Sequence, residues 1–221
     1  MLSVTQNRFS NIVPGAEQFF EAYFVMVIFD TSLKVRTWYN KRMKFELKIT
    51  DKLSLVIPKI EDSQDIFNAI DTDRNHLKEW LPWVDKTISI KDTEENILKR
   101  IDEFEKKEAA SFYIVYENQF IASVGFISLD TINKQGEIGY WILSGFQGKG
   151  LMTECVRACI KYGFEELNLN KIVIKCSSEN IKSAAIPKRL GFTLEGTLRQ
   201  ERIRNGTFHD TLVFGLLKSD W

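Results

Sequence analysis

The sequence predicts an α+β fold, in which a mixed, mostly antiparallel sheet of about six to seven strands carries helices on both faces. Runs of alternating apolar residues recur in the chain, and turn signals at residues 117–119 and 205–206 join neighbouring runs as hairpins. Amphipathic helix patterns separate other runs. With 221 residues, of which 44% are hydrophobic, the chain is long enough to bury the core of one domain.

The expected elements follow in chain order from the spacing of apolar residues. Residues 53–57 alternate as a strand, and residues 61–70 form a helix pattern with Ile66, Phe67 and Ile70 facing inward. Residues 93–107 give the clearest helix, because acidic residues occupy its first turn and basic residues its last, which matches the helix dipole. Further strands are expected at residues 112–116, 120–129, 136–143, 172–176, 192–204 and 207–217.

A glycine-rich turn at residues 144–153 lies between the strand at 136–143 and a helix whose apolar face includes Val156 and Ile160. Its sequence is Ser-Gly-Phe-Gln-Gly-Lys-Gly-Leu-Met-Thr. Glycine lets the backbone approach a ligand closely, and the free N–H groups of the first helical turn point toward that ligand. The turn is therefore a candidate anion site, for which a pyrophosphate is the natural occupant.

Two familiar nucleotide motifs do not fit this turn. A P-loop needs a glycine where Leu143 stands and a serine or threonine where Gly150 follows Lys149. A dinucleotide fingerprint needs a small residue at Thr153 and a turn that opens the fold. The turn fits instead a Gln/Arg-x-x-Gly-x-Gly/Ala pattern, in which Met152 takes the last place.

With these motifs the sequence resembles the GNAT acetyltransferase superfamily, in particular its ribosomal-protein N-terminal (alanine or serine) acetyltransferases. The resemblance runs from about Lys52 to Trp221. Four segments carry it in family order. They are Trp-Leu-Pro-Trp at residues 80–83, Gly-Glu-Ile-Gly-Tyr-Trp at residues 136–141, the glycine turn at residues 147–153, and residues 180–192, where Asn-Ile-Lys-Ser leads to Arg-Leu-Gly-Phe. Met152-Thr153 departs from the usual small residue and looks like the variant of this branch.

The resemblance implies a GNAT fold that binds acetyl-coenzyme A, with the pantetheine along strand residues 138–143 and the pyrophosphate on residues 147–153. Asn180 is expected to contact the cofactor arm or to cap the following helix. The expected cofactor-binding residues are Ile138, Tyr140, Trp141, Ile142, Leu143, Gln147, Gly148, Lys149, Gly150, Leu151, Met152, Thr153, Asn180, Ser183 and Arg189.

Acetyl transfer to an amine needs a base for the amine proton and a donor for the leaving thiolate. The resemblance points to two glutamates as the base, Glu201 slightly ahead of Glu137, and the alternative for Glu201 is a salt bridge with Arg199 or Arg202. Ser183 takes the place of the thiolate donor in this branch, and its alternative role is a hydroxyl near a helix start.

Other conspicuous side chains have plainer interpretations. Aromatic residues usually belong to a core, but in the resembled branch one of Trp80 and Trp83 borders the acceptor cleft. His76 and His209 have no neighbouring ligands in sequence, so no metal site is predicted. The three cysteines, at positions 155, 159 and 176, form no redox or metal motif and are expected to be buried thiols.

The predicted function is direct transfer of an acetyl group to a primary amine, most simply the N-terminal α-amine of a ribosomal protein, whose pKa of about 8 makes it easy to deprotonate. A small amine such as an antibiotic or a polyamine is the first alternative, and a non-catalytic acyl-coenzyme A sensor is the second. Thirty basic and 30 acidic residues balance, so neither nucleic acid nor a membrane is an expected partner. A cytoplasmic protein is expected. The sequence leaves its oligomeric state open, and a homodimer is one alternative.

Residues 1–42 share no motif with the rest of the chain. Their apolar run at residues 19–29 contains Glu21 and is too short to span a bilayer, and no signal-peptide pattern precedes it. The resembled family begins near Met43, so we expect residues 43–221 to form the acetyltransferase domain and residues 1–42 to be an extension, with Met43 as an alternative start.

Overall fold

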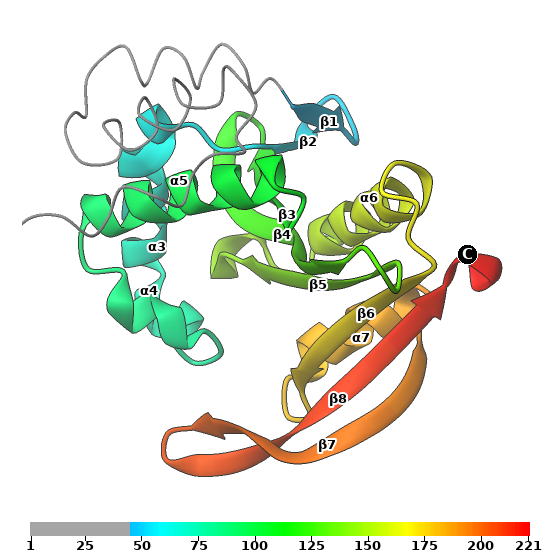
Figure 1. Ribbon diagram of the computed structural model, residues 1–221. Coiled ribbons are helices and arrows are strands. Elements are labelled where there is room, and N and C mark those ends of the chain that lie inside the picture. Colours follow the sequence, from blue (N-terminus) through cyan, green and yellow to red (C-terminus); the bar gives the residue numbers. More distant parts are fainter. Residues whose placement is uncertain (1–44) are drawn as a thin grey trace, which may run out of the picture. The chain divides into compact units, whose positions relative to one another are not determined.

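The computed structural model describes residues 45–221, and the expectation for residues 1–42 lies outside them (Figure 1). An eight-stranded sheet runs through the described part in the order β1-β2-β3-β4-β5-β6-β8-β7. All neighbouring strands are antiparallel except β5 and β6, which are parallel. The strands are β1 (Glu46–Lys48), β2 (Leu53–Val56), β3 (Ala110–Tyr116), β4 (Gln119–Asp130), β5 (Gln135–Ile142), β6 (Lys171–Ser177), β7 (Thr193–Arg204) and β8 (Thr207–Leu217).

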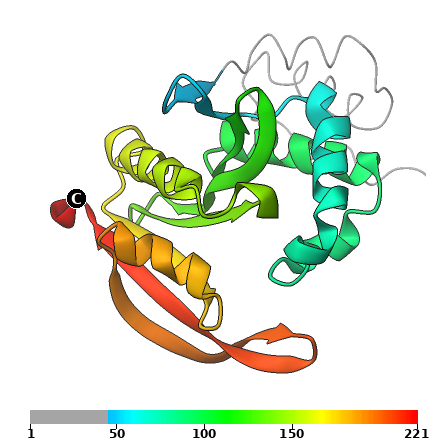
Figure 2. The same cartoon turned by 180° about the vertical axis from the view of Figure 1, so that it is seen from behind.

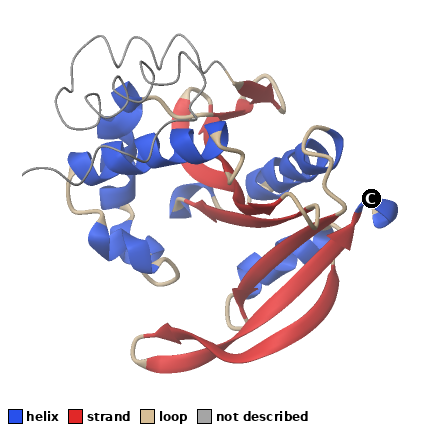
Figure 3. Cartoon of the chain, in the orientation of Figure 1, coloured by secondary structure: helices blue, strands red, loops and turns tan. Residues whose placement is uncertain are grey.

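The helices fall into two groups along the chain (Figure 3). One group precedes β3, where α3 and α5 pack against each other, and the other follows β5, where α6 packs against β4 and β5 and α7 packs against β6. Among residues 45–221, no helix is long and apolar enough to cross a membrane. The helices are η1 (Ile60–Asp62), α3 (Ser63–Thr72), α4 (Arg74–Leu77), η2 (Pro82–Lys86), α5 (Ile90–Glu105), η3 (Ser144–Phe146), α6 (Leu151–Glu165), α7 (Ile181–Arg189) and η4 (Lys218–Asp220).

The core is centred on β4. Six consecutive residues of this strand, 121–126, are buried, and because successive side chains of a strand point to opposite faces, both faces of the sheet are covered here. Phe126 fills the space between the sheet and α6, where a Cβ added to Gly163 would come within 2.5 Å of its ring. The absence of a side chain at Gly163 therefore lets α6 lie close against the sheet.

The predicted fold class is confirmed, with two differences in detail. The sheet has eight strands instead of about six to seven, because β1, an edge strand of only three residues that pairs with β2, was not among the predicted strands. Helix α5 begins at Ile90 and not at residue 93, because Ser89 caps it: the Ser89 hydroxyl accepts from the Asp92 N–H, while the Asp92 carboxylate accepts from the Ser89 N–H at 2.8 Å.

The parallel pairing of β5 and β6 stops partway along both strands. Register pairs run only from Gln135–Lys171 to Ile138–Ile174, yet β5 continues to Ile142 and β6 to Ser177. Beyond Ile138, β5 remains paired with β4 on its other side. The two strands therefore separate at their C-terminal ends, and the β6-facing backbone groups of residues 139–142 are left without strand partners, directly before the glycine turn.

Candidate active site

The glycine turn forms an open backbone cradle at the start of α6. Gly148 and Gly150 have left-handed backbone angles, with φ of 75° and 77°, which L side chains rarely adopt. A Cβ added at either position would meet no atom within 4 Å, so the space in front of the turn is free. Gly150 is the N-cap of α6 and supplies no side-chain cap, which leaves the first-turn N–H groups for an anion.

Two contacts from the short helix α4 brace the turn. Asp73, directly before α4, accepts from the Ser144 N–H at 2.6 Å and from the Ser144 hydroxyl at 2.7 Å. One turn later, His76 Nε2 lies 2.7 Å from Gln147 Nε2, while the Lys182 ammonium of α7 donates to Gln147 Oε1 at 3.0 Å. Gln147, predicted as a cofactor residue, is thus held by two other segments.

Tyr140 and Ser183 face each other where β5 and β6 have separated. The Tyr140 hydroxyl donates to the backbone carbonyl of Ser183 at 2.9 Å, and the Ser183 hydroxyl donates to the Tyr140 oxygen at 3.3 Å. Asn180 caps α7, because its side-chain oxygen accepts from the Ser183 N–H at 3.0 Å. Burial raises the pKa of Tyr140 well above its ordinary value, so the phenol stays protonated at neutral pH.

The other predicted cofactor residues divide into exposed and buried groups. Lys149 is exposed, and its ammonium lies 5.0 Å from the centre of the Phe146 ring. Arg189 donates to the Thr153 hydroxyl at 2.9 Å, which ties the end of α7 to the start of α6. The buried group consists of Ile138, Leu143, Met152 and Thr153, whose side chains are at most 8% exposed, so these residues offer a ligand chiefly their backbone groups. Trp141, Ile142 and Leu151 are half-buried.

The two candidate bases have different surroundings. Glu137 lies on the paired part of β5, and its carboxylate forms an ion pair with Lys175 of β6 at 3.0 Å. Glu201 is exposed on β7 and forms no ion pair within residues 45–221. The alternative salt bridge with Arg202 is not formed, because Arg202 donates to the Thr211 hydroxyl at 3.0 Å. Of the two candidate bases, only Glu201 is thus without an ion pair in the described part.

A bulge in β7 determines how Glu201 is presented. Residues 199–201 stand opposite the single residue Asp210, between the pairs Leu198–Thr211 and Arg202–His209. Gln200 adopts a left-handed φ of 55°, and its N–H donates to Asp210 Oδ1 at 2.9 Å. The strand expected at residues 192–204 is therefore irregular at this point, because the left-handed Gln200 and the two extra residues interrupt the alternation of side chains.

Trp80 and Trp83, one of which was expected to border the acceptor cleft, pack against different parts of the domain. Trp83 packs against Trp141 with ring centres 5.6 Å apart, so it joins the β5 side of the site. The Trp141 indole N–H is buried and has no hydrogen-bond partner within residues 45–221. Trp80 instead lies beneath the guanidinium of Arg204, 4.3 Å from ring centre to Cζ.

The structure thus brings together the end of β5, the glycine turn, Trp83 and the first turn of α7, whereas no side-chain hydrogen bond or ion pair within residues 45–221 links Glu137 or Glu201 to them. Sequence reasoning missed Asp73, His76 and Lys182. Asp73 and Ser144 are 71 residues apart, and no local pattern connects them. An aspartate at a helix boundary was the one available sign.

Comparison with known proteins agrees with this arrangement. The YdaF protein of Bacillus subtilis (strain 168) is 31% identical over 181 residues, which cover 80% of this chain and 97% of that protein. RimL, a ribosomal L7/L12 α-N-protein acetyltransferase solved with coenzyme A, has a TM-score of 0.76 at 25% identity and covers 78% of this chain and 98% of its own. MccE, a microcin C7 self-immunity acetyltransferase solved with acetyl-CoA and AMP, has a TM-score of 0.73 at 27% identity, covering 77% and 95%. Residues 52–193 match the acetyltransferase (GNAT) domain model, and the chain belongs to this acetyltransferase family.

Proposed function

We propose that this protein transfers an acetyl group from acetyl-coenzyme A to the N-terminal α-amine of a protein, a ribosomal protein being the first candidate. The observation that carries the proposal is the separation of β5 and β6 between the glycine turn and the Tyr140–Ser183 pair. An elongated thioester with a pyrophosphate at one end suits that arrangement. The acceptor class is supported by the similarity to RimL.

The residues present fit acetyl-coenzyme A. Its pyrophosphate suits the open cradle of Gly148 and Gly150 and the uncapped N-terminus of α6. Its pantetheine amides suit the β6-facing backbone groups of residues 139–142, which have no strand partner. When bound, the cofactor supplies an activated acetyl thioester. The exposed ammoniums of Lys149 and Lys182 add positive charge beside the cradle.

Two proton transfers are assigned to this chain. Glu201 takes the proton of the acceptor amine, with Glu137 as the alternative, because Glu201 lacks a charged partner in the described part and Glu137 is paired with Lys175. Ser183 would give its hydroxyl proton to the thiolate sulfur that leaves when the amine displaces it from the acetyl carbon, and would regain a proton from solvent. The protonated Tyr140 hydroxyl, 3.3 Å away, sets the orientation of Ser183. Backbone N–H groups of β5 stabilise the oxyanion.

A small amine is the second candidate acceptor. The similarity to MccE, at 27% identity, favours it, because that acetyltransferase was solved with AMP in addition to acetyl-CoA. A reaction with either acceptor would use the same cofactor side of the site. The two reactions would differ in the acceptor that lies beside Trp80 and Trp83. Three free, buried thiols suit a reducing compartment, and we place the protein in the cytoplasm.

The test is coenzyme A release from acetyl-coenzyme A across peptides that begin with Ser, Ala or Met, beside polyamines, aminoglycosides and a nucleotide amine. We expect turnover of at least one peptide class. The same peptides with a blocked N-terminus are the control and should give only background hydrolysis. Turnover confined to a small amine would replace the protein acceptor with the second candidate.

A further inference from the structure

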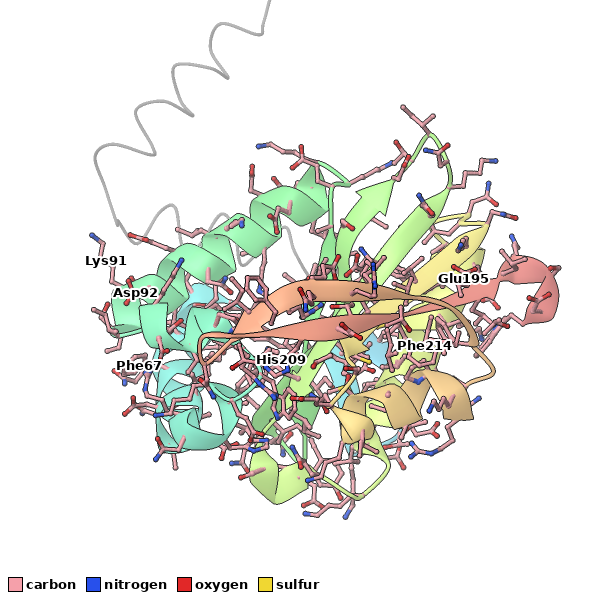
Figure 4. The ribbon with its side chains drawn as sticks, turned by 90° about the horizontal axis from the view of Figure 1, so that it is seen from below. Phe67, Lys91, Asp92, Glu195, His209 and Phe214 are labelled. Carbon is pink, nitrogen blue, oxygen red and sulfur yellow. The ribbon has the colours of Figure 1, made fainter. Side chains whose placement is uncertain are left out.

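Four side chains from three separate segments meet beside the proposed acceptor side of the site. Trp80 follows α4, Glu179 precedes α7, and Arg204 and His209 lie on the hairpin of β7 and β8. We call these four residues the Arg204 cluster. Figures 1 and 2 show the turn of this hairpin extending on the side of the sheet where α4 lies, and Figure 4 shows His209 on β8, nearer to that turn than Phe214.

The guanidinium of Arg204 is the centre of the cluster. Its Cζ lies 4.3 Å from the centre of the Trp80 ring, and its Nη2 donates to Glu179 Oε2. The second oxygen of Glu179 lies 3.1 Å from His209 Nδ1. The Arg204 Nη1 atom is removed from solvent and has no hydrogen-bond partner within residues 45–221. Because Nη1 is buried and 25% of the Arg204 side chain is exposed, the guanidinium is partly desolvated, and its attraction to the indole is stronger than at a fully exposed site; the Glu179 side chain is 49% exposed, so solvent screens the ion pair more.

Each segment in the cluster also carries a residue assigned to the reaction. Glu179 directly precedes Asn180, whose side chain caps α7 at Ser183. Arg204 stands three residues after Glu201 on the same strand, beyond the bulge. Trp80 leads into η2, where Trp83 packs against Trp141. One guanidinium thus connects the strand of the proposed base, the helix of the proposed acid and the aromatic segment.

We propose that Arg204 is a positioning residue for the acceptor, an inference that rests on the proposed function. By holding Trp80 against the hairpin, it fixes the distance between the aromatic segment and the strand that carries Glu201. The cofactor turn is held by other side chains, Asp73, His76 and Lys182, none of which forms a hydrogen bond or ion pair with the Arg204 cluster within residues 45–221. Arg204 therefore sets the affinity for the acceptor without altering the affinity for acetyl-coenzyme A.

Steady-state kinetics of Arg204→Ala test this assignment, with the wild type's best peptide as the varied acceptor. Loss of a partly desolvated cation–π contact should raise the KM for the peptide by about tenfold. The KM for acetyl-coenzyme A should stay at the wild-type value. Arg204→Lys should lie between the two proteins, because an ammonium keeps the charge but loses the flat face that stacks on the indole. This second variant also serves if the alanine protein does not fold.

Arg202→Ala is the matched control, since Arg202 lies on the same strand but hydrogen-bonds to Thr211 and takes no part in the Arg204 cluster, and its peptide KM should stay unchanged. In a double-mutant cycle, Trp80→Leu with Arg204→Ala should raise the peptide KM little more than Arg204→Ala alone. An equal rise in both KM values, an unchanged peptide KM, or multiplicative effects in the cycle would overturn the role of Arg204. Turnover of small amines but of no peptide by the wild type would overturn the proposed protein acceptor, and a small amine would then be the varied acceptor.

Discussion

At the residue scale, Ser183, the proposed proton donor, is hydrogen-bonded to Tyr140 and does not stand alone. Ser183 was assigned from the resemblance alone, whereas its hydrogen bond to Tyr140 joins residues 43 positions apart in the chain. The sequence predicted that Tyr140 contacts the cofactor but not that it contacts Ser183. That contact depends on the separation of β5 and β6, which no local pattern reveals.

Tyr140→Phe removes only the hydroxyl that orients Ser183. We expect kcat to fall by about tenfold, the lower end of what a positioned proton donor contributes, with the KM for acetyl-coenzyme A little changed. Burial raises the pKa of Tyr140 above the ordinary tyrosine value of about 10, so the phenol stays protonated throughout the neutral pH range. The wild-type kcat should therefore show no ionisation of Tyr140 between about pH 6 and pH 9. A kcat equal to that of the wild type would rule out a role for the Tyr140 hydroxyl.

The two candidate bases are separated by matched amide variants. Glu201→Gln should lower kcat by 100-fold or more, on the order expected for loss of a general base. Glu137→Gln should cost less than about tenfold, because it removes an ion pair on a part-buried strand and not the base. Both are measured as pH profiles of kcat/KM with one peptide. If Glu137→Gln were the slower variant, Glu137 and not Glu201 would be the general base. If both variants were fully active, neither glutamate would be the base.

At the element scale, turn chemistry decides where the site forms. The glycine turn, the hairpin turn at Asn205-Gly206 and the strand limits follow from residue patterns, and the left-handed angles of both Asn205 and Gly206 confirm the predicted hairpin. The bulge at Gln200 was not predicted, because it depends on a hydrogen bond to Asp210 on the partner strand. Helix α5 starts three residues before the predicted position, because the Ser89–Asp92 capping box, and not the charge pattern, determines where it begins.

The glycine turn offers a matched pair of substitutions. Gly148→Ala forces an L side chain into φ of 75°, which costs about 1–2 kcal/mol. We expect a higher Kd for coenzyme A in calorimetry and a lower unfolding temperature. Gly145→Ala adds the same methyl group to equally open space in the same turn, at a residue without a left-handed φ, and should change neither quantity. Equal effects from both variants would show that the added methyl group, and not the backbone conformation, is responsible.

At the scale of the described domain, eight strands are arranged so that a single parallel pair opens beside the glycine turn. The sequence predicted the fold class, the order of the elements and the cradle, because these depend on local periodicity and on glycine positions. The braces at Asp73 and His76 and the Arg204 cluster could not be predicted, because each joins segments brought together only by the folded sheet.

The central claim is acetyl transfer to a protein α-amine, and tandem mass spectrometry of one product tests it most directly. The substrate is a peptide with an N-terminal serine and one internal lysine, incubated with the protein and acetyl-coenzyme A. We predict a single added acetyl group, found on the N-terminal fragment ions alone. An acetyl group on the lysine, or an unmodified peptide under conditions in which a small amine is acetylated, would contradict the claim.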